Sequence, residues 1–165
     1  MKYPEILTYL KEGQFEFELL EHPPVRTVEE ANIYLKDLPA QGSKNLFLEE
    51  EKTGVHWLVS VCDQKRVDLK ALTAVLNSRR FSFGKPEAMM RYLGVEPGAV
   101  TLLGLINDTE NSLRVAIDRD LWLAQRIQCH PLVNTASILI SPNAVERFIV
   151  QTGHKIEMIT VPEKS

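Results

Sequence analysis

The chain has 165 residues, of which 44% are hydrophobic and 25% are charged, and its formal net charge is −3. This length supports one hydrophobic core, so we expect a single domain over residues 1–165. A net negative charge argues against a protein that coats nucleic acid through an overall basic field. Because charged residues interrupt the first eleven positions, we expect no signal peptide, no membrane span and a cytoplasmic location.

The first part of the chain alternates helical and extended patterns. Residues 4–12 have helical apolar spacing and are followed by Gly13, which suits a helix end. Apolar residues at 15, 17 and 19 alternate with glutamates and predict a strand that stops at His22-Pro23-Pro24. The capping-box spacing from Thr27 to Glu30 predicts a short helix that continues to Leu35.

The remaining elements follow from turn residues and caps. We expect a hairpin of residues 45–48 and 55–61, followed by a helix capped by Asp68 and a strand at 80–83. Next we expect a helix from Pro86 to Gly94, a loop at 95–103 and a strand at 113–117. The last expected elements are a helix from Asp118 or Asp120 through LWLAQRI, a strand at 138–140, a helix from Ser141 to Val150 and a strand at 156–161. Strands and helices mix without a strict βαβ period. The sequence therefore predicts an α+β fold with a mixed or largely antiparallel sheet.

Known catalytic motifs are absent from the sequence. There is no GxSxG, GxxxxGK[ST], GxGxxG or HExxH, which argues against motif-bearing hydrolases, P-loop proteins, Rossmann enzymes and zincins. Cys62 and Cys129 form no CxxC pair, so we expect no disulfide, metal or cofactor. Cys129 and His130 are adjacent in an extended segment, where their side chains point apart, and this disfavours a cysteine hydrolase.

A few polar residues remain as candidates. Lys44 stands at the start of an apolar strand, where it is either a solvated gatekeeper or the charged group of a pocket. His22 and His130 each precede a proline, which either fixes the ring for function or simply ends a strand. We expect His56 and His154 to be structural or exposed. The Asn107-Asp108 pair is either a plain turn or a polar pocket wall.

Seven segments in order resemble one known family. They are EHPPVRTVEEA at 21–31, GSKNLFL at 42–48, RVDLKAL at 66–72, GVEPGAVT at 94–101, GLIND at 104–108, HPLVNTAS at 130–137 and TGHK at 152–155. Together they resemble the YbaK-like aminoacyl-tRNA editing domains, and among these the free-standing proteins similar to the insertion domain of prolyl-tRNA synthetase. The resemblance covers nearly the whole chain and implies a barrel-like sheet with short helices around it.

The resemblance also implies an activity and a site. It implies hydrolysis of the ester that joins a wrong amino acid to tRNA(Pro): alanine in the most similar branch, cysteine in a related one. The family's lysine, its neighbour and its HPL histidine fall on Lys44, Asn45 and His130, the expected catalytic residues. The expected substrate-binding residues are His22, Gly98, Gly104, Asn107 and Asp108. The substrate's own 2′-hydroxyl is expected to help orient the water, because no side chain is an evident general base.

The expected partner is the acceptor end of mischarged tRNA(Pro), with prolyl-tRNA synthetase as a further candidate. Basic residues concentrate between positions 65 and 91, and we expect the tRNA contacts at Lys65, Arg66, Lys70 and Arg80. One departure from the family pattern is Leu102, which stands where a proline is often found and bears on the choice of amino acid. A binding module without catalysis, which recognises tRNA or a free amino acid, is the alternative.

Overall fold

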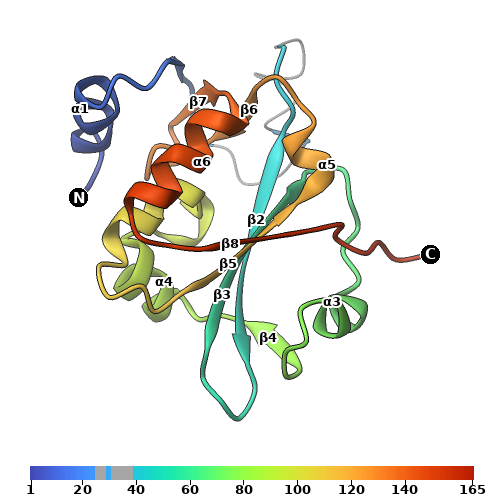
Figure 1. Cartoon of the computed structure of the whole chain (residues 1–165). Helices are drawn as coiled ribbons and strands as arrows, with labels where there is room; N and C mark the ends of the chain where they lie inside the picture. Colours follow the sequence, from blue (N-terminus) through green and yellow to red (C-terminus); the bar gives the residue numbers. More distant parts are fainter. Residues whose placement is uncertain (25–28, 31–38) are drawn as a thin grey trace.

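The computed structural model describes residues 1–24, 29–30 and 39–165 (Figure 1). Its elements are α1 (Glu5–Glu12), β1 (Phe17–Glu21), β2 (Ser43–Glu50), β3 (His56–Cys62), α3 (Leu69–Val75), β4 (Phe81–Phe83), α4 (Pro86–Leu93), the 3₁₀ helices η1 (Pro97–Ala99) and η2 (Leu102–Asn107), β5 (Arg114–Asp118), α5 (Arg119–Trp122), β6 (Ile127–Cys129), β7 (Ala136–Ile140), α6 (Pro142–Gln151) and β8 (Ile156–Ile159). The helix expected from Thr27 falls largely outside the described residues.

The strands form two sheets. A five-stranded sheet has the order β4-β2-β3-β5-β8, in which the β2 pairs are antiparallel and the β5 pairs are parallel. A three-stranded antiparallel sheet has the order β1-β7-β6. The predicted α+β fold with a mixed sheet is confirmed. The expected barrel is not formed, because β4 and β8 remain edge strands among the described residues.

The two sheets meet where β2 begins. The Gln41 N–H donates to the Arg126 carbonyl at 2.8 Å, and the Gln41 carbonyl accepts from the Gln128 N–H at 3.0 Å. The Ser43 hydroxyl donates to the Gln128 carbonyl. The start of β2 therefore lies along β6, directly before His130. This arrangement brings residues 44–45 and residue 130 to the same region, although 85 positions separate Ser43 from Gln128 in the chain.

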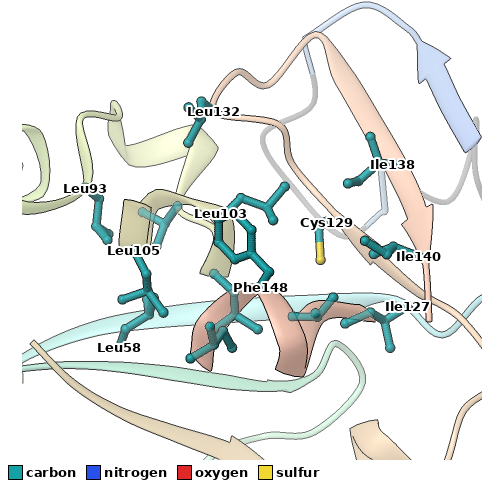
Figure 2. Packing of buried hydrophobic residues seen from close by; sticks show 14 of the residues in the cluster. Leu58, Leu93, Leu103, Leu105, Ile127, Cys129, Leu132, Ile138, Ile140 and Phe148 are labelled. Carbon is teal, nitrogen blue, oxygen red and sulfur yellow. The ribbon is translucent and has the colours of Figure 1, made fainter. Parts of the chain in front are cut away.

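Both faces of the central β2–β3 hairpin are buried. Phe47 and Leu58 face a cluster that includes α6 and the three-stranded sheet, with Phe148 near its centre (Figure 2). Leu48 and Trp57 face a second cluster that includes residues of α3. Full burial of such side chains contributes about 1.5–3 kcal/mol each. Because successive strand residues point to opposite faces, each position of β2 belongs to one of these two sides.

Local capping signals predicted several helices correctly. The Asp68 carboxylate accepts from the Ala71 N–H at 3.0 Å, and the Ser141 hydroxyl oxygen accepts from the Ala144 N–H at 3.2 Å. Gly94 ends α4 in the left-handed conformation, with φ of 68°. None of the helices in the described part of the chain is long and apolar enough to cross a bilayer.

The helix expected through LWLAQRI is wrong beyond its first turn. Helix α5 has only 4 residues, and Ile127–Cys129 forms strand β6 instead. Ile127 and Cys129 pair with β7 and are buried in the larger core cluster. Strand pairing with a distant segment thus overrides the helical pattern.

Candidate active site

His130 lies at the base of a loop that ends at Ala136. Its Nδ1 donates to the Ala136 carbonyl at 3.2 Å. A carbonyl can only accept, so Nδ1 carries the proton and Nε2 keeps a lone pair, with no hydrogen-bond partner among the described residues. Burial lowers the pKa of His130 below its ordinary value, and His22 adds to this, although the Ala136 carbonyl opposes both. The ring is therefore neutral at neutral pH.

His22 supports the other end of the same loop. Its N–H donates to the Thr135 carbonyl at 2.9 Å, and its Nε2 lies 2.9 Å from the Ser137 hydroxyl oxygen. Its Nδ1 lies 2.8 Å from the Pro23 carbonyl, which requires the proton on Nδ1 and leaves Nε2 to accept from Ser137. Both ring nitrogens are thus engaged within the protein, and His22 acts as a brace for the loop.

The loop walls a cavity of about 390 Å³. Leu132 to Thr135 form one wall, and the segment from Gly94 through Gly98 to Ala99 forms the opposite one. A Cβ atom on Gly98 would lie 3.1 Å from the side-chain nitrogen of Asn134. The two walls are therefore close enough that a side chain at position 98 would crowd Asn134. Gly98 therefore lines the cavity, and its role in substrate binding stays a prediction.

Asn45 joins β2 to the glycine-containing wall. Its Nδ2 donates to the Val100 carbonyl at 3.3 Å. Its Oδ1 is buried and has no hydrogen-bond partner among the described residues, and the same holds for the hydroxyl of Ser60, its neighbour across the strand pair. An unpaired buried acceptor costs about 1–3 kcal/mol, so a polar ligand group that reached this oxygen would offset part of that cost.

Lys44 lies on the other face of β2. It is paired with Val61, which belongs to the cluster on the α3 side. Its ammonium donates to the Lys65 carbonyl. Burial raises the pKa of the nearby Asp63, whereas the charge of Lys44 acts in the opposite direction. The side chain of Asn45 thus lies on one face of β2, and the ammonium of Lys44 lies on the other.

The segment 104–108 does not line the cavity. A Cβ atom on Gly104 would lie 3.0 Å from the Leu93 Cβ, so this glycine permits η2 to pack against α4. The Asn107 amide donates to the Leu93 carbonyl at 2.9 Å and accepts from the Met1 ammonium at 2.7 Å. The expected substrate contacts of Gly104 and Asn107 do not fit these positions.

Asp108 is likewise committed to the fold. Its side chain is 2% exposed and accepts from the Leu113 N–H at 2.8 Å, the Ser112 N–H at 3.1 Å and His154 Nε2 at 2.8 Å. A carboxylate that is this deeply buried among three protein donors is not accessible to a substrate. The expected substrate contact of Asp108 therefore does not fit either, whereas the expectation that His154 is structural does.

The four expected tRNA contacts divide into one buried and three exposed residues. The Lys65 side chain is 7% exposed and lies 3.1 Å from Asp118 and 2.9 Å from Asp120. Burial acts to lower the pKa of Lys65, but these carboxylates outweigh it and raise the pKa. Lys65 therefore stays protonated, but its positive charge is balanced by the two carboxylates, so it is a poor partner for a phosphate. The exposed residues are Arg66, Lys70 and Arg80, the last with a carboxylate of Glu51 at 3.8 Å.

Two further observations limit the chemistry of the site. Burial raises the pKa of the Cys129 thiol to about 12, so it is not a nucleophile at neutral pH. Leu102 is 1% exposed and packs in the core rather than on the cavity wall.

Sequence reasoning missed Asn134 as a residue of the cavity wall. The only signal for Asn134 was its place inside the HPLVNTAS segment.

Comparison with known proteins identifies the family. The model of the aminoacyl-tRNA editing domain matches residues 22–148. The prolyl-tRNA editing protein ProX of Acetoanaerobium sticklandii is 29% identical over 93% of this chain and 94% of its own length. The prolyl-tRNA synthetase associated domain-containing protein 1 of Danio rerio is 34% identical over 91% of this chain and 82% of its own length.

A solved structure agrees with the fold. A candidate trans-editing enzyme for prolyl-tRNA synthetase superposes with a TM-score of 0.71 at 21% identity, over 99% of this chain and 100% of that one. At this identity the likeness concerns the fold. Taken with the family model, which covers most of the chain, it leads to one conclusion: the chain belongs to the family of aminoacyl-tRNA editing domains.

Proposed function

We propose that this aminoacyl-tRNA deacylase acts in trans on mischarged tRNA(Pro) and that the amino acid it removes is alanine. The observation that carries the proposal is His130, whose Nδ1 is fixed by Ala136 while Nε2 stays unpaired at the base of the cavity loop. The related ProX is named for prolyl-tRNA editing, which supports the choice of tRNA. Such a reaction belongs in the cytoplasm, where tRNA is charged.

The proposed reaction is ester hydrolysis. A water oxygen attacks the carbonyl carbon of the aminoacyl ester, and its proton passes to His130 Nε2 or through the 2′-hydroxyl of the terminal ribose. The tetrahedral intermediate then collapses: the bond from carbon to the ribose 3′-oxygen breaks, and that oxygen takes up the proton. The products are a free amino acid and tRNA with an intact 3′ end.

The cavity walls supply the supporting groups. The Gly98 N–H makes no backbone hydrogen bond within the described residues, so it is free to donate to the developing oxyanion. The Gly104 N–H already donates to the Thr101 carbonyl at 3.1 Å, so it is not free to donate to the oxyanion. Asn45 holds the wall through Val100 and presents its unpaired Oδ1 to the amino or hydroxyl groups of the substrate.

The choice of alanine follows the branch of the family that the chain most resembles. Leu102 does not alter the cavity wall, because it is buried in the core. A methyl-sized difference is worth about 1–3 kcal/mol in such a pocket. This margin favours alanine over larger amino acids but separates it less from cysteine.

The ammonium of Lys44 lies on the opposite face of β2 from Asn45 and donates to the Lys65 carbonyl. Lys44 is proposed to exchange this contact for a phosphate or ribose oxygen of the terminal nucleotide, and the exposed Arg66, Lys70 and Arg80 are proposed to contact the incoming strand. Lys44→Ala should lower kcat/KM by about 10- to 100-fold, because a charge-assisted hydrogen bond contributes about 1.5–3 kcal/mol. The measurement is release of amino acid from Ala-tRNA(Pro), with thermal unfolding as the control for folding. Unchanged turnover would remove Lys44 from the mechanism.

Parallel incubations with Ala-tRNA(Pro), Cys-tRNA(Pro) and Pro-tRNA(Pro) test the substrate. We expect fast loss of alanine, slower loss of cysteine and no loss of proline. Faster loss of cysteine would reassign the amino acid, and hydrolysis of none would refute the deacylase proposal in favour of a binding module.

A further inference from the structure

A second cavity, of about 270 Å³, lies between α4 and the part of the β2–β3 hairpin far from Asn45. Two of its lining residues, His56 and Tyr92, are aromatic, and Phe47 packs behind His56 in the core. The Phe47 and His56 rings are 5.2 Å apart between centroids and 26° from parallel, and the Tyr92 ring lies 5.1 Å from His56. His56 and Tyr92 are half-buried, and neither ring forms a hydrogen bond with the described residues. Such rings form a stacking surface for a planar ligand.

Charged side chains surround this aromatic wall without pairing. Lys85 and Arg91 contribute two cations, and Glu49 and Glu87 contribute two carboxylates. The Arg91 guanidinium lies 5.2 Å above the Tyr92 ring. None of the four forms a salt bridge within the described part of the chain, although opposite charges line the same cavity. A ligand with both anionic groups and hydrogen-bond donors would satisfy them together.

A cytidine nucleotide has this combination of groups. Its base stacks on aromatic rings, its 4-amino group donates to a carboxylate, and its phosphate accepts from lysine or arginine. A free amino acid lacks the planar ring, and an apolar peptide would leave all four charges unpaired. The chemistry of the wall therefore favours a nucleotide.

The position of the cavity relates it to the candidate active site. Asn45 and Glu49 point to the same face of β2 and are four residues apart, which corresponds to about 13 Å along a strand. The unpaired 3′ end of tRNA ends in CCA, so the two cytidines lie one and two nucleotides from the adenosine that carries the ester. A strand extended to about twice the stacked rise of about 3.4 Å per nucleotide spans this distance in about two nucleotides, which places the second cytidine at this range.

We infer that the cavity lined by His56, Tyr92, Lys85 and Arg91 binds an unpaired cytidine of the tRNA 3′ strand. The base lies against His56 and Tyr92, its amino group faces Glu49 or Glu87, and the flanking phosphate contacts Lys85 and Arg91. The inference rests on the proposed function for the choice of RNA, since the acylated end must lie at the other cavity. It explains why a protein of negative net charge can hold a polyanion at its 3′ end.

The test measures binding of an uncharged, fluorescently labelled RNA oligonucleotide that ends in CCA, by anisotropy, with the full chain. His56→Ala and Tyr92→Leu should each weaken the affinity about tenfold, because stacking supplies most of the contact. Lys85→Gln should weaken it a few-fold and reduce the slope of log affinity against log salt by about 0.7. The matched control is Lys155→Gln, an exposed lysine beside a cavity of similar size, of about 310 Å³, lined also by Arg114 and Glu157.

The outcomes are separable from those of the deacylase proposal, because this RNA carries no ester. Replacement of both cytidines of the RNA by uridine should weaken binding about as much as His56→Ala. If aromatic variants misfold in thermal unfolding, Lys85→Gln and Arg91→Gln, which change exposed side chains, decide the matter. Unchanged affinity in these variants overturns the inference, as does equally tight binding of free cytidine monophosphate, which would make the cavity a mononucleotide site. Lost hydrolysis with intact RNA binding would contradict only the deacylase.

Discussion

His130 and His154 show how differently two shielded imidazoles can be used. His154, whose side chain is 1% exposed, has both ring nitrogens engaged, Nε2 with Asp108 at 2.8 Å and Nδ1 with the Thr152 hydroxyl oxygen at 2.8 Å. That hydroxyl donates onward to the Ile149 carbonyl at 2.6 Å. His130 has one nitrogen fixed by Ala136, and the other has no partner in the described structure.

The difference extends to the regions around the two rings. Near His154, the polar groups of Asn107 and Asp108 are bound within the fold. Near His130, the Oδ1 of Asn45 is buried and unpaired, and Asn134 faces a cavity. Buried polar groups are nearly always paired in proteins, so those that are left open point to a ligand. His154 thus serves the fold, whereas His130 keeps one ring nitrogen open, as its proposed catalytic role requires.

The largest expected effect comes from the open histidine. His130→Ala should lower kcat for deacylation about 10²- to 10⁴-fold, the range for loss of a general base. Thermal unfolding should change little, since the ring contributes one hydrogen bond to the fold. Single-turnover kinetics on Ala-tRNA(Pro) measure the effect. A variant that unfolds while its folded fraction keeps full activity would place His130 in the same class as His154.

Lys65 tests whether other fully paired groups behave as His154 does. Lys65→Met removes the cation between Asp118 and Asp120 and leaves the buried Asp118 without its partner. Breaking a buried pair in this way costs about 3–5 kcal/mol of unfolding free energy. Urea denaturation measures the loss, with the exposed Lys70→Met as the matched control. If Lys65→Met is stable but binds tRNA weakly, the residue serves the RNA after all.

A smaller loss of stability is expected at the structural histidine. Asp108→Asn keeps the shape of the side chain but removes the charge that accepts from His154 and two backbone N–H groups. We expect a loss of about 1.5–3 kcal/mol, with Tm lower by about 2–4 °C per kcal/mol. Calorimetry measures Tm, and the activity of the folded protein should be unchanged. A selective loss of activity would show that residues 104–108 belong to the site.

The pH dependence of the reaction gives the smallest effect. Because the pKa of His130 is lowered in the folded protein, the ring stays neutral down to a pH below the ordinary value of about 6.5. The His130-dependent rate should therefore be flat from pH 7 to 8 and decline only below pH 6.5, as the ring is protonated. Rates of His130→Ala at each pH supply the background for subtraction. A decline that begins above pH 7 would contradict the assignment.

Sequence reasoning succeeded where the cause was local. Asp68, Ser141 and Gly94 mark helix boundaries through contacts with residues a few positions away. It failed at Ile127–Cys129, because a strand of 3 residues has too short a pattern and depends on pairing with β7. The expected barrel also failed, because closure depends on which edges pair, and no local pattern records that.

The candidate site was predicted in part for the same reason. Of the residues to which the resemblance pointed, Gly98 lines the cavity, Asn45 donates to Val100 next to that wall, and His130 lies at the base of the loop that forms the other wall. The resemblance did not indicate that Lys65 would form a buried ion pair with Asp118, which is 53 positions away. The placement of Lys44 on the face opposite to Asn45 follows from strand alternation. Because both faces of β2 are packed against the core, the two side chains face different parts of the protein.

Leu132 gives the loop beyond His130 a particular mechanical property. Its φ of 70° is unusual for a leucine and costs about 1–3 kcal/mol, yet its side chain is only 6% exposed and packs in the core near Leu103 (Figure 2). Opening the loop would withdraw this anchor from the core. This wall of the cavity is consequently held in place by the core before any ligand binds. In the proposed deacylation, an oversized amino acid would meet this fixed wall during binding, before any bond is broken.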